Sequence, residues 1–201
     1  MKRGAKFREL IDVFKKIEGI SSKQAEKFAY SLLCMKKEDR IQLGDTIANL
    51  GNFIRKCEKC NMWYEEEKCP FCESNERDFD VLMVTNDYNI VENFEKMGSF
   101  RGQYFVLRDM ASVNSTPSSR EEDLHKLLER LRIIKVREII LAFDYNQFGD
   151  VNALYVENAL KDVNIKITRL ARGIPTNTSI LSLDLITLEE SLINRKQGRK
   201  G

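Results

Sequence analysis

Four cysteines constrain this chain more tightly than any other feature of its sequence. They form two Cys-x-x-Cys knuckles with eight residues between them, at Cys57, Cys60, Cys69 and Cys72. Zn²⁺ binds four thiolates in a tetrahedron, and each Cys-x-x-Cys turn puts two sulfurs on the same side of a tight loop. The spacing therefore predicts a closed structural zinc site, with about one ion per chain and no open position for a substrate.

Two other uses of these cysteines are a pair of disulfides and a redox-active dithiol. Disulfides belong to oxidising compartments, whereas this sequence shows neither a signal peptide nor a long apolar segment, so we expect a reducing cytoplasm and no membrane. A redox motif needs only one Cys-x-x-Cys. The fifth cysteine, Cys34, lies in the apolar run from Tyr30 to Met35 and is expected in the core.

The charge of the chain is unevenly distributed. Its 201 residues carry a net charge of +2, but residues 1–60 hold 14 Lys and Arg against 8 Asp and Glu, and residues 61–201 hold 19 against 23. The N-terminal part is therefore the candidate for contact with a polyanion, although a solvated helix surface would give the same surplus.

Residues 6–54 have the spacing of apolar side chains that predicts helices. Between the first two helical stretches, Gly19 permits a tight turn, and Ser21 or Ser22 can cap the helix that follows. Two short helices joined in this way, with a lysine just inside the second, are typical of a helix-hairpin-helix motif that meets a phosphate through backbone N–H groups. Most helical hairpins bind nothing, so the pattern alone does not decide whether this hairpin binds a phosphate.

After the cysteines, the period of the apolar residues changes to that of strands alternating with helices. The predicted strands are residues 79–84, 103–107, 138–143 and 165–170. This alternation predicts a mostly parallel sheet covered by helices, with any functional site at the carboxyl ends of the strands. There Asp87 and Asp144 are candidates for Mg²⁺ binding, and the alternative is that each aspartate caps a loop or helix.

Little else in the sequence suggests catalysis. The chain has no Gly-x-x-x-x-Gly-Lys-Ser/Thr run, so we do not expect a P-loop ATPase. The sole histidine, His125, falls on the polar side of an amphipathic stretch and is expected at the surface. Residues 111–119 are predicted to form a long polar loop, and residues 195–200 a basic tail.

Four groups of residues, together with the order of the predicted elements, carry a resemblance to a known family. They are Ile17-Glu18-Gly19-Ile20 with Lys23-Gln24-Ala25, the four-cysteine spacing, Gly102-Gln103-Tyr104, and Ala171-Arg172-Gly173-Ile174-Pro175. With them the chain resembles the bacterial recombination-mediator RecR family over nearly its whole length. The resemblance implies a multi-domain α and α/β protein. Its parts would be a helix-hairpin-helix domain (1–54), the four-cysteine zinc motif (55–76), a Toprim-type domain with a mostly parallel sheet (79–173) and a C-terminal segment with a basic tail (174–201).

The chain also departs from the family pattern. Asn86 stands where a Toprim domain usually carries an acidic residue at the first strand end, and Phe148 stands where the family usually has a glutamate before the glycine. Both departures argue against metal-dependent cleavage or joining of nucleic-acid strands. Ser21 replaces the second glycine of the usual Gly-Ile-Gly hairpin, and residues 176–178 replace a glycine-rich stretch.

The resemblance implies a non-enzymatic, DNA-binding scaffold for recombinational repair. Such a protein assembles into a ring-like homo-oligomer and acts with RecO and, in many bacteria, RecF to load recombinase at DNA gaps. Lys23 and Lys27 are then the candidate DNA contacts, because they can neutralise phosphates without reading bases.

Two other functions remain open from the sequence. One is a Mg²⁺-dependent Toprim enzyme, such as a small nuclease or primase-like protein, that uses Asp87, Asp144 and Asp150. The other is a module that binds protein partners only.

Overall fold

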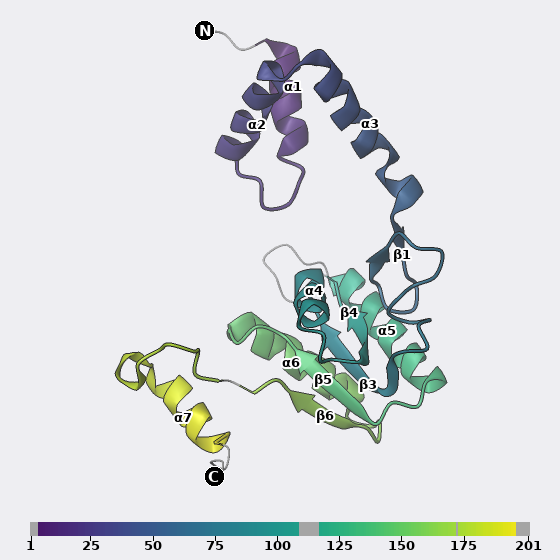
Figure 1. The fold of residues 1–201 in the computed structure, drawn as a ribbon, viewed down its shortest axis with the longest axis vertical. Coiled ribbons are helices and arrows are strands. Elements are labelled where there is room, and N and C mark those ends of the chain that lie inside the picture. The colour runs from purple at the N-terminus through teal and green to yellow at the C-terminus, as the bar shows by residue number, and fades with distance from the viewer. Residues whose placement is uncertain (1–3, 109–116, 172, 196–201) are drawn as a thin grey trace. The chain divides into compact units, whose positions relative to one another are not determined.

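The chain forms two compact units, Met1–Arg55 and Lys56–Gly201, in a computed structural model (Figure 1). The structure describes residues 4–108, 117–171 and 173–195. We refer to the two parts as the helical unit and the larger unit. The boundary between them lies directly before the first cysteine knuckle, and the finer division expected from the sequence stays a prediction.

The helical unit consists of three helices. They are α1 (Ala5–Phe14), α2 (Ser22–Cys34) and α3 (Lys37–Phe53). The first two pack as a hairpin through the rings of Phe7 and Tyr30, whose centroids are 4.8 Å apart, and through Ala25 and Ala29, which are fully buried on one side of α2. Small alanines allow the two helices to approach closely, so the helical spacing read from residues 6–54 is confirmed.

The expectation that Cys34 lies in a core was wrong, because its side chain is exposed at the end of α2. Each helical residue is rotated by about 100° from the one before it. Cys34 is therefore turned away from Leu32, the last side chain of α2 that continues its inward face and is partly buried.

A four-stranded parallel sheet forms the centre of the larger unit. Its strands are β3 (Asp78–Thr85), β4 (Gly102–Val106), β5 (Glu138–Ala142) and β6 (Lys166–Arg169). They lie in the order β4-β3-β5-β6, and all three pairings are parallel. Each predicted strand is present, with ends that differ from the prediction by at most one residue. The connecting helices are α4 (Tyr88–Met97), α5 (Pro117–Ile133) and α6 (Gln147–Leu160).

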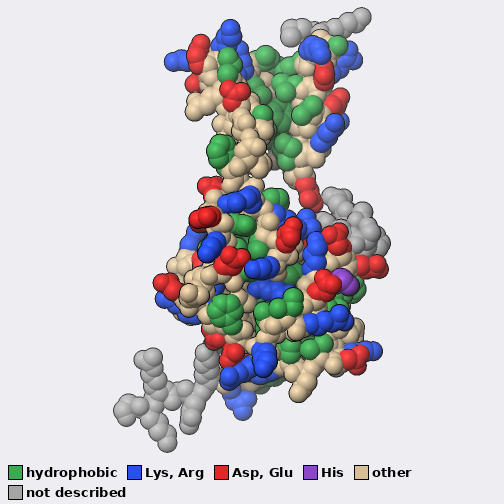
Figure 2. Space-filling view, turned by 90° about the vertical axis from the view of Figure 1, so that its right-hand side faces the viewer, with side chains coloured by type: hydrophobic (Ala, Val, Ile, Leu, Met, Phe, Trp, Pro, Cys, Tyr) green, Lys and Arg blue, Asp and Glu red, His purple; other side chains and the backbone are tan. Residues whose placement is uncertain are grey.

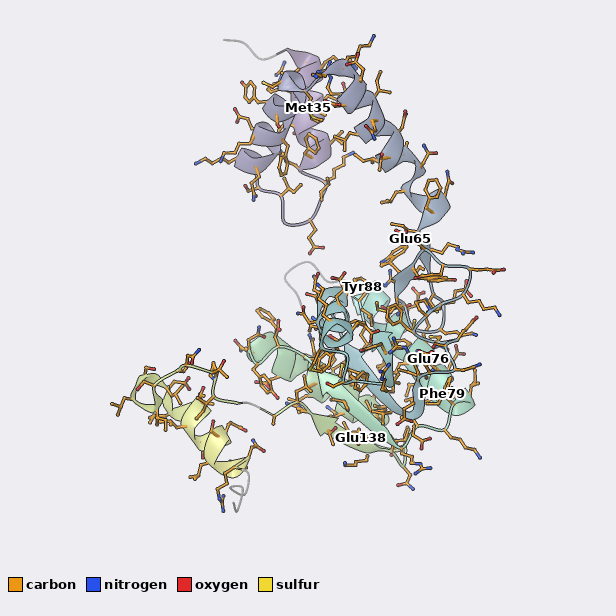
Figure 3. All side chains as sticks on the ribbon, viewed as in Figure 1. Met35, Glu65, Glu76, Phe79, Tyr88 and Glu138 are labelled. Atoms are coloured by element: carbon orange, nitrogen blue, oxygen red, sulfur yellow. The ribbon has the colours of Figure 1, made fainter. Side chains whose placement is uncertain are left out.

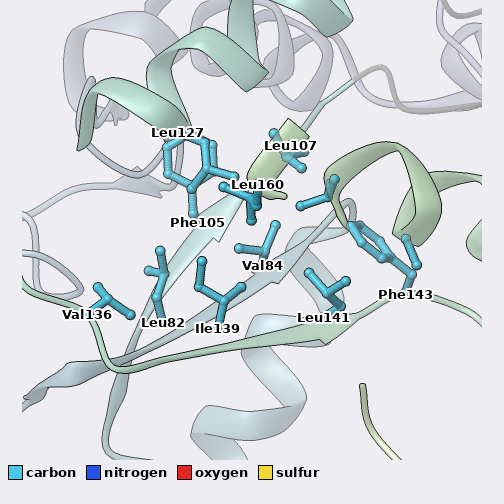
Figure 4. Packing of buried hydrophobic residues seen from close by; sticks show 12 residues of the cluster. Leu82, Val84, Phe105, Leu107, Leu127, Val136, Ile139, Leu141, Phe143 and Leu160 are labelled. Atoms are coloured by element: carbon cyan, nitrogen blue, oxygen red, sulfur yellow. The ribbon is translucent and has the colours of Figure 1, made fainter. Parts of the chain in front are cut away.

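Alternate side chains of the strands build two hydrophobic cores, one on each face of the sheet. Leu82 of β3 belongs to the first core, where strand residues pack against Leu127 of α5 and Leu160 of α6 (Figure 4). Met83, the next residue, belongs to the second core together with Val91 of α4 and the four-cysteine segment. The cysteine segment therefore covers part of one face of the sheet.

The end of the described chain forms a short 3-10 helix, η1 (Ile180–Ser182), and the helix α7 (Leu185–Ile193). The carboxylate of Asp184 caps α7 by accepting a hydrogen bond from the backbone N–H of Thr187 at 2.8 Å. The sequence pattern did not predict this helix. None of the helices in the described parts of the chain is both long and apolar enough to cross a membrane.

Candidate metal centre and nucleic-acid interface

The four predicted ligands come together in the larger unit. Their sulfurs all lie within 4.8 Å of one another, with 3.9 Å between Cys57 and Cys72 and 3.7 Å between Cys60 and Cys69. A disulfide would need about 2.05 Å, so all four cysteines are free. A zinc tetrahedron with Zn–S bonds of about 2.3 Å has S–S edges of about 3.8 Å. The spacing of the sulfurs fits that ion.

Local backbone geometry forms the first knuckle. The backbone N–H of Cys57 donates to the carbonyl of Met62 at 2.8 Å, and the N–H of Asn61 donates to the carbonyl of Cys57 at 2.9 Å. Asn61 has φ of 62°, a left-handed conformation that asparagine adopts more readily than most residues. Two short strands, β1 (Arg55–Lys56) and β2 (Trp63–Tyr64), pair on either side of this turn.

Hydrogen bonds join the first knuckle to β4. The N–H of Val106 donates to the carbonyl of Cys60 at 2.9 Å, and the side-chain amide of Asn61 donates to the carbonyl of Val106 at 2.8 Å. From α5, the guanidinium of Arg130 donates to the carbonyls of Lys59 at 2.9 Å and Tyr104 at 3.0 Å. The first knuckle is therefore an integral part of the larger unit and not a separate small domain.

Arg77 joins the second knuckle to the sheet. Its Nε donates to the carbonyl of Pro70 at 3.0 Å, and its Nη2 donates to the carboxylate of Glu95 at 2.6 Å. The guanidinium carbon lies 5.3 Å from the ring centroids of both Phe71 and Tyr104. Burial raises the pKa of Tyr104, and the hydrogen bond that its hydroxyl donates to Glu95 at 2.6 Å raises it further.

The acidic residues at the strand ends have separate roles. The carboxylate of Asp87 caps α4 by accepting from the N–H of Asn89 at 2.8 Å, which confirms the capping alternative for this residue. Asn146, and not Asp144, caps α6, because its side-chain oxygen accepts from the N–H of Gly149 at 2.9 Å. Asp109, which follows the second predicted strand in the sequence, lies outside the described residues.

Asp144 and Asp150 line one small pocket, and Arg169 lines it with them. The Arg169 guanidinium lies 3.3 Å from the carboxylate of Asp150 and also binds Glu157 at 2.9 Å. Within the described ranges, the only group of three or more Cys, His, Asp or Glu arranged to hold a metal ion is the cysteine cluster. The geometry does not bring Asp87, Asp144 and Asp150 together as a three-carboxylate site.

The hairpin turn presents the two candidate DNA contacts. Gly19 has φ of 80°, and Ser21 caps α2 by accepting from the N–H of Gln24 at 3.3 Å, while the Gln24 side chain accepts from the N–H of Ser21 at 2.9 Å. This reciprocal cap confirms the predicted start of the helix. Lys23 and Lys27 follow in the first two turns of α2, and both are exposed. Their role in DNA binding stays a prediction.

Comparisons with known proteins agree with this architecture. The model of the Toprim domain matches residues 80–171, which hold β4, β5, β6 and all of β3 except its first two residues. The recombination protein RecR of Staphylococcus aureus strain JH9 and that of strain Newman are each 32% identical to this chain over 189 residues, covering 94% of this chain and 96% of the relative. The chain belongs to the RecR family. Membership supports a role in recombination and DNA repair.

The cysteine cluster of this RecR-family chain fits a metal ion chemically as well as geometrically. Hydrogen bonds from the other three thiols, with the one from Cys60 the strongest, lower the pKa of Cys57. The hydrogen bond between Cys60 and Cys57 raises the pKa of Cys60. Unequal pKa values are expected when four thiols share a small volume, because they cannot all ionise without a cation between them. A bound Zn²⁺ would supply that charge and hold all four as thiolates.

Three residues that build the site were missed in the sequence: Asn61, Arg77 and Arg130. Arg130 carried a signal, because it lies three residues after Leu127 and so falls on the apolar face of α5, where a charge requires partners. Asn61 and Arg77 carried none, because their partners in β4 and α4 are distant in the chain.

Proposed function

We propose that this RecR-family chain is a non-enzymatic, DNA-binding recombination mediator that acts in the cytoplasm. It would work with RecO-like and, in many bacteria, RecF-like proteins to help load recombinase at DNA gaps. The observation that carries the proposal is the likeness to RecR, which extends over 94% of the chain and so includes the helical hairpin, the cysteine knuckles and the sheet. A structural Zn²⁺, held by the four cysteines, would stabilise the region between the hairpin and the sheet.

The proposed DNA contact is electrostatic. Lys23 is the second residue of α2, and the backbone N–H groups at the start of a helix have no partners within the helix. Lys23 and Lys27 lie one helical turn apart and are both exposed, so they can approach neighbouring phosphates together. Contacts of this kind fix a protein on the DNA backbone without reading sequence.

One hairpin offers few contacts, so we propose that a ring-like homo-oligomer presents several hairpins to one DNA molecule. Exposed apolar side chains support self-association. Ile47 and Phe53 of α3 are 63% and 67% exposed, and Leu185 and Leu192 of α7 are 83% and 66% exposed. Figure 2 shows hydrophobic side chains on the surface of the helical unit. Monomeric proteins rarely leave such surfaces open to water.

The absence of catalysis is part of the proposal. Two-metal chemistry on nucleic acids needs carboxylates that converge on ions about 4 Å apart. Here the Asp87 carboxylate is occupied as a helix cap, and Asp150 is paired with Arg169. Phe148, which is 53% exposed, brings no carboxylate to the same strand end.

A salt titration of DNA binding, with the mass of the oligomer measured in parallel, tests the proposal. We expect similar affinity for unrelated sequences and a linear fall of log affinity with log salt, with a slope of about −0.9 for each phosphate contact on duplex DNA. Absence of DNA binding at low salt by a zinc-loaded oligomer would refute the proposal and favour a module that binds proteins only.

A further inference from the structure

The single tryptophan of the chain, Trp63, lies on β2 beside the first cysteine knuckle and is 48% exposed. It is held on a rigid support. The knuckle bond from Cys57 to Met62, at 2.8 Å, reverses the chain, and β1, which ends in Lys56, pairs with β2, which begins with Trp63. Residues that face each other across such a ribbon project from the same side. The exposed indole and the Lys56 ammonium group therefore come from two paired strands.

Two further cations lie near Lys56. Arg108 follows β4, and its guanidinium lies 3.3 Å from Asp123, whose side chain is 1% exposed. Lys126 lies one turn further along α5 and pairs with Glu122 at 2.7 Å. Both Arg108 and Lys126 act electrostatically on the Lys56 ammonium. Figure 2 shows Lys and Arg side chains interspersed with Asp and Glu on the face of the larger unit that carries its histidine.

Tyr88 is the first residue of α4 (Figure 3). Its hydroxyl is buried, and the Trp63 side chain is one of its neighbours. Burial raises the pKa of Tyr88, and the nearby side chains of Arg108 and Trp63 partly oppose that effect. The phenol and the indole therefore belong to one surface.

An aromatic ring beside several cations is the combination that binds single-stranded nucleic acid. Unpaired bases stack on exposed rings, and Lys and Arg meet the phosphates on either side. Among the described residues, Arg108 pairs with Asp123 and Lys126 pairs with Glu122. The exposed pair of Lys126 with Glu122 contributes little stability, so Lys126 can exchange its carboxylate for a phosphate. Bases in a duplex are already stacked on each other and would not compete.

We propose that Trp63, Lys56, Arg108 and Lys126 form a contact site for single-stranded DNA on the larger unit, with one base stacked on the indole. This inference rests on the proposed function, because it requires DNA as a ligand. It goes beyond that function by assigning the single strand to a surface other than the hairpin lysines.

The fluorescence of the wild-type protein tests the proposal directly, because Trp63 is the only tryptophan and reports on this surface alone. We expect saturable quenching by oligothymidylate that weakens with salt, and little quenching by a blunt duplex. Trp63→Ala should lower affinity for oligothymidylate by about 5- to 150-fold and leave duplex affinity unchanged. Trp63→Phe should retain most of the affinity for the single strand.

A matched control is Phe79→Ala, which removes another exposed ring of the larger unit, 43% exposed on β3, and should leave oligothymidylate affinity unchanged. Zinc content and oligomer mass check that each variant folds, and Lys56→Glu gives a second variant that leaves the ring in place. It should also weaken binding of the single strand.

The possible failures are distinguishable. If the wild-type protein binds neither duplex nor oligothymidylate, the proposed function fails. A second outcome is that the wild-type protein binds DNA, while oligothymidylate leaves the Trp63 fluorescence unchanged and binds Trp63→Ala as tightly as wild type. That result overturns only this inference. Quenching by a purified RecO-like protein, and not by oligothymidylate, would also overturn it and identify the surface as a protein interface.

Discussion

The side-chain amide of Asn61 donates a hydrogen bond to the carbonyl oxygen of Val106 at 2.8 Å. Val106 in turn donates its backbone N–H to the carbonyl of Cys60 at 2.9 Å. Through these two bonds the first cysteine knuckle is attached to the edge strand β4, and Cys60 and Val106 share one hydrophobic core. Loss of the metal should therefore disturb the sheet as well as the knuckles.

Removal of one zinc ligand should unfold the segment 57–72 and lower the melting temperature of the larger unit. The segment is too short to fold on its own apolar area, so metal binding supplies its folding free energy. Cys57→Ser should lose the zinc, of which the wild type carries about one ion per chain. Metal analysis and thermal denaturation check this result.

Cys34→Ser is the matched control, because Cys34 is exposed and distant in the chain from the knuckles. It should keep both the zinc and the melting temperature. A wild-type protein that is fully folded and free of metal would contradict the assignment.

Replacement of Glu95 by glutamine should destabilise the protein at neutral pH by about 1–3 kcal/mol, because Arg77 and Tyr104 lose a charged partner. Burial acts to raise the pKa of Glu95, but hydrogen bonds from these two residues outweigh it and hold the pKa below its usual value. A carboxyl group with a lowered pKa stabilises the fold above its unfolded pKa and loses that effect as pH falls through its folded pKa.

The difference between wild type and Glu95→Gln should therefore shrink as the pH falls below about 4. Urea denaturation at neutral and acidic pH measures it. Glu92→Gln, on the same helix, is the control, because Glu92 is 63% exposed and pairs only weakly with Lys96 at 3.5 Å. Its effect should stay within about 0.5 kcal/mol. A constant difference at every pH would exclude the charged form of Glu95 as the cause.

Gly102→Ala should destabilise the protein by about 1–3 kcal/mol, because the added methyl group overpacks a tight site. A Cβ at this position would clash with the ring of Phe100 and would lie 2.8 Å from the carbonyl oxygen of Val81. Gly44→Ala is the control with the opposite sign. Nothing lies within 4 Å of a Cβ there, and alanine favours the α3 helix by about 1 kcal/mol. Equal effects of the two changes in denaturation experiments would contradict the packing argument.

Purified protein should not nick or join DNA in the presence of Mg²⁺. Among the described acids at the strand ends, the Asp87 carboxylate caps α4, and Asp150 is paired with Arg169. A plasmid-nicking assay with wild type and Asp144→Ala checks the expectation. Mg²⁺-dependent nicking that disappears in Asp144→Ala would instead support a Toprim enzyme.

Most of the fold could be predicted from local patterns. The apolar runs of the strands identified all four to within one residue at each end, because β4 and much of β3 and β5 are buried, while β6 is the more exposed edge strand. The cap at Ser21 and the cysteine cluster were also predicted correctly, because both depend on residues close in the chain. Exposure of His125, on the solvent side of α5, was likewise confirmed.

The features that local sequence patterns missed depend on packing between residues distant in the chain, or on which of two nearby residues makes a hydrogen bond. The role of Arg77 required knowing that Glu95 and Pro70 meet across the second knuckle. The capping alternative was considered for Asp144, whereas the backbone path after β5 makes Asn146 the cap of α6. The predicted loop 111–119 falls mostly outside the described residues, and the structure begins α5 at Pro117.

The central claim is that the hairpin lysines bind DNA phosphates, and the double variant Lys23→Glu/Lys27→Glu tests it most directly. Its control, Lys135→Glu/Lys161→Glu, makes the same change of charge at two exposed lysines of the larger unit. Affinity for duplex DNA is measured across a range of salt, with zinc content and oligomer mass as checks of folding. We predict weaker binding to all sequences and a salt slope flatter by about 1 for each phosphate that is no longer neutralised, and a control close to wild type. Wild-type affinity and slope in Lys23→Glu/Lys27→Glu would contradict the account.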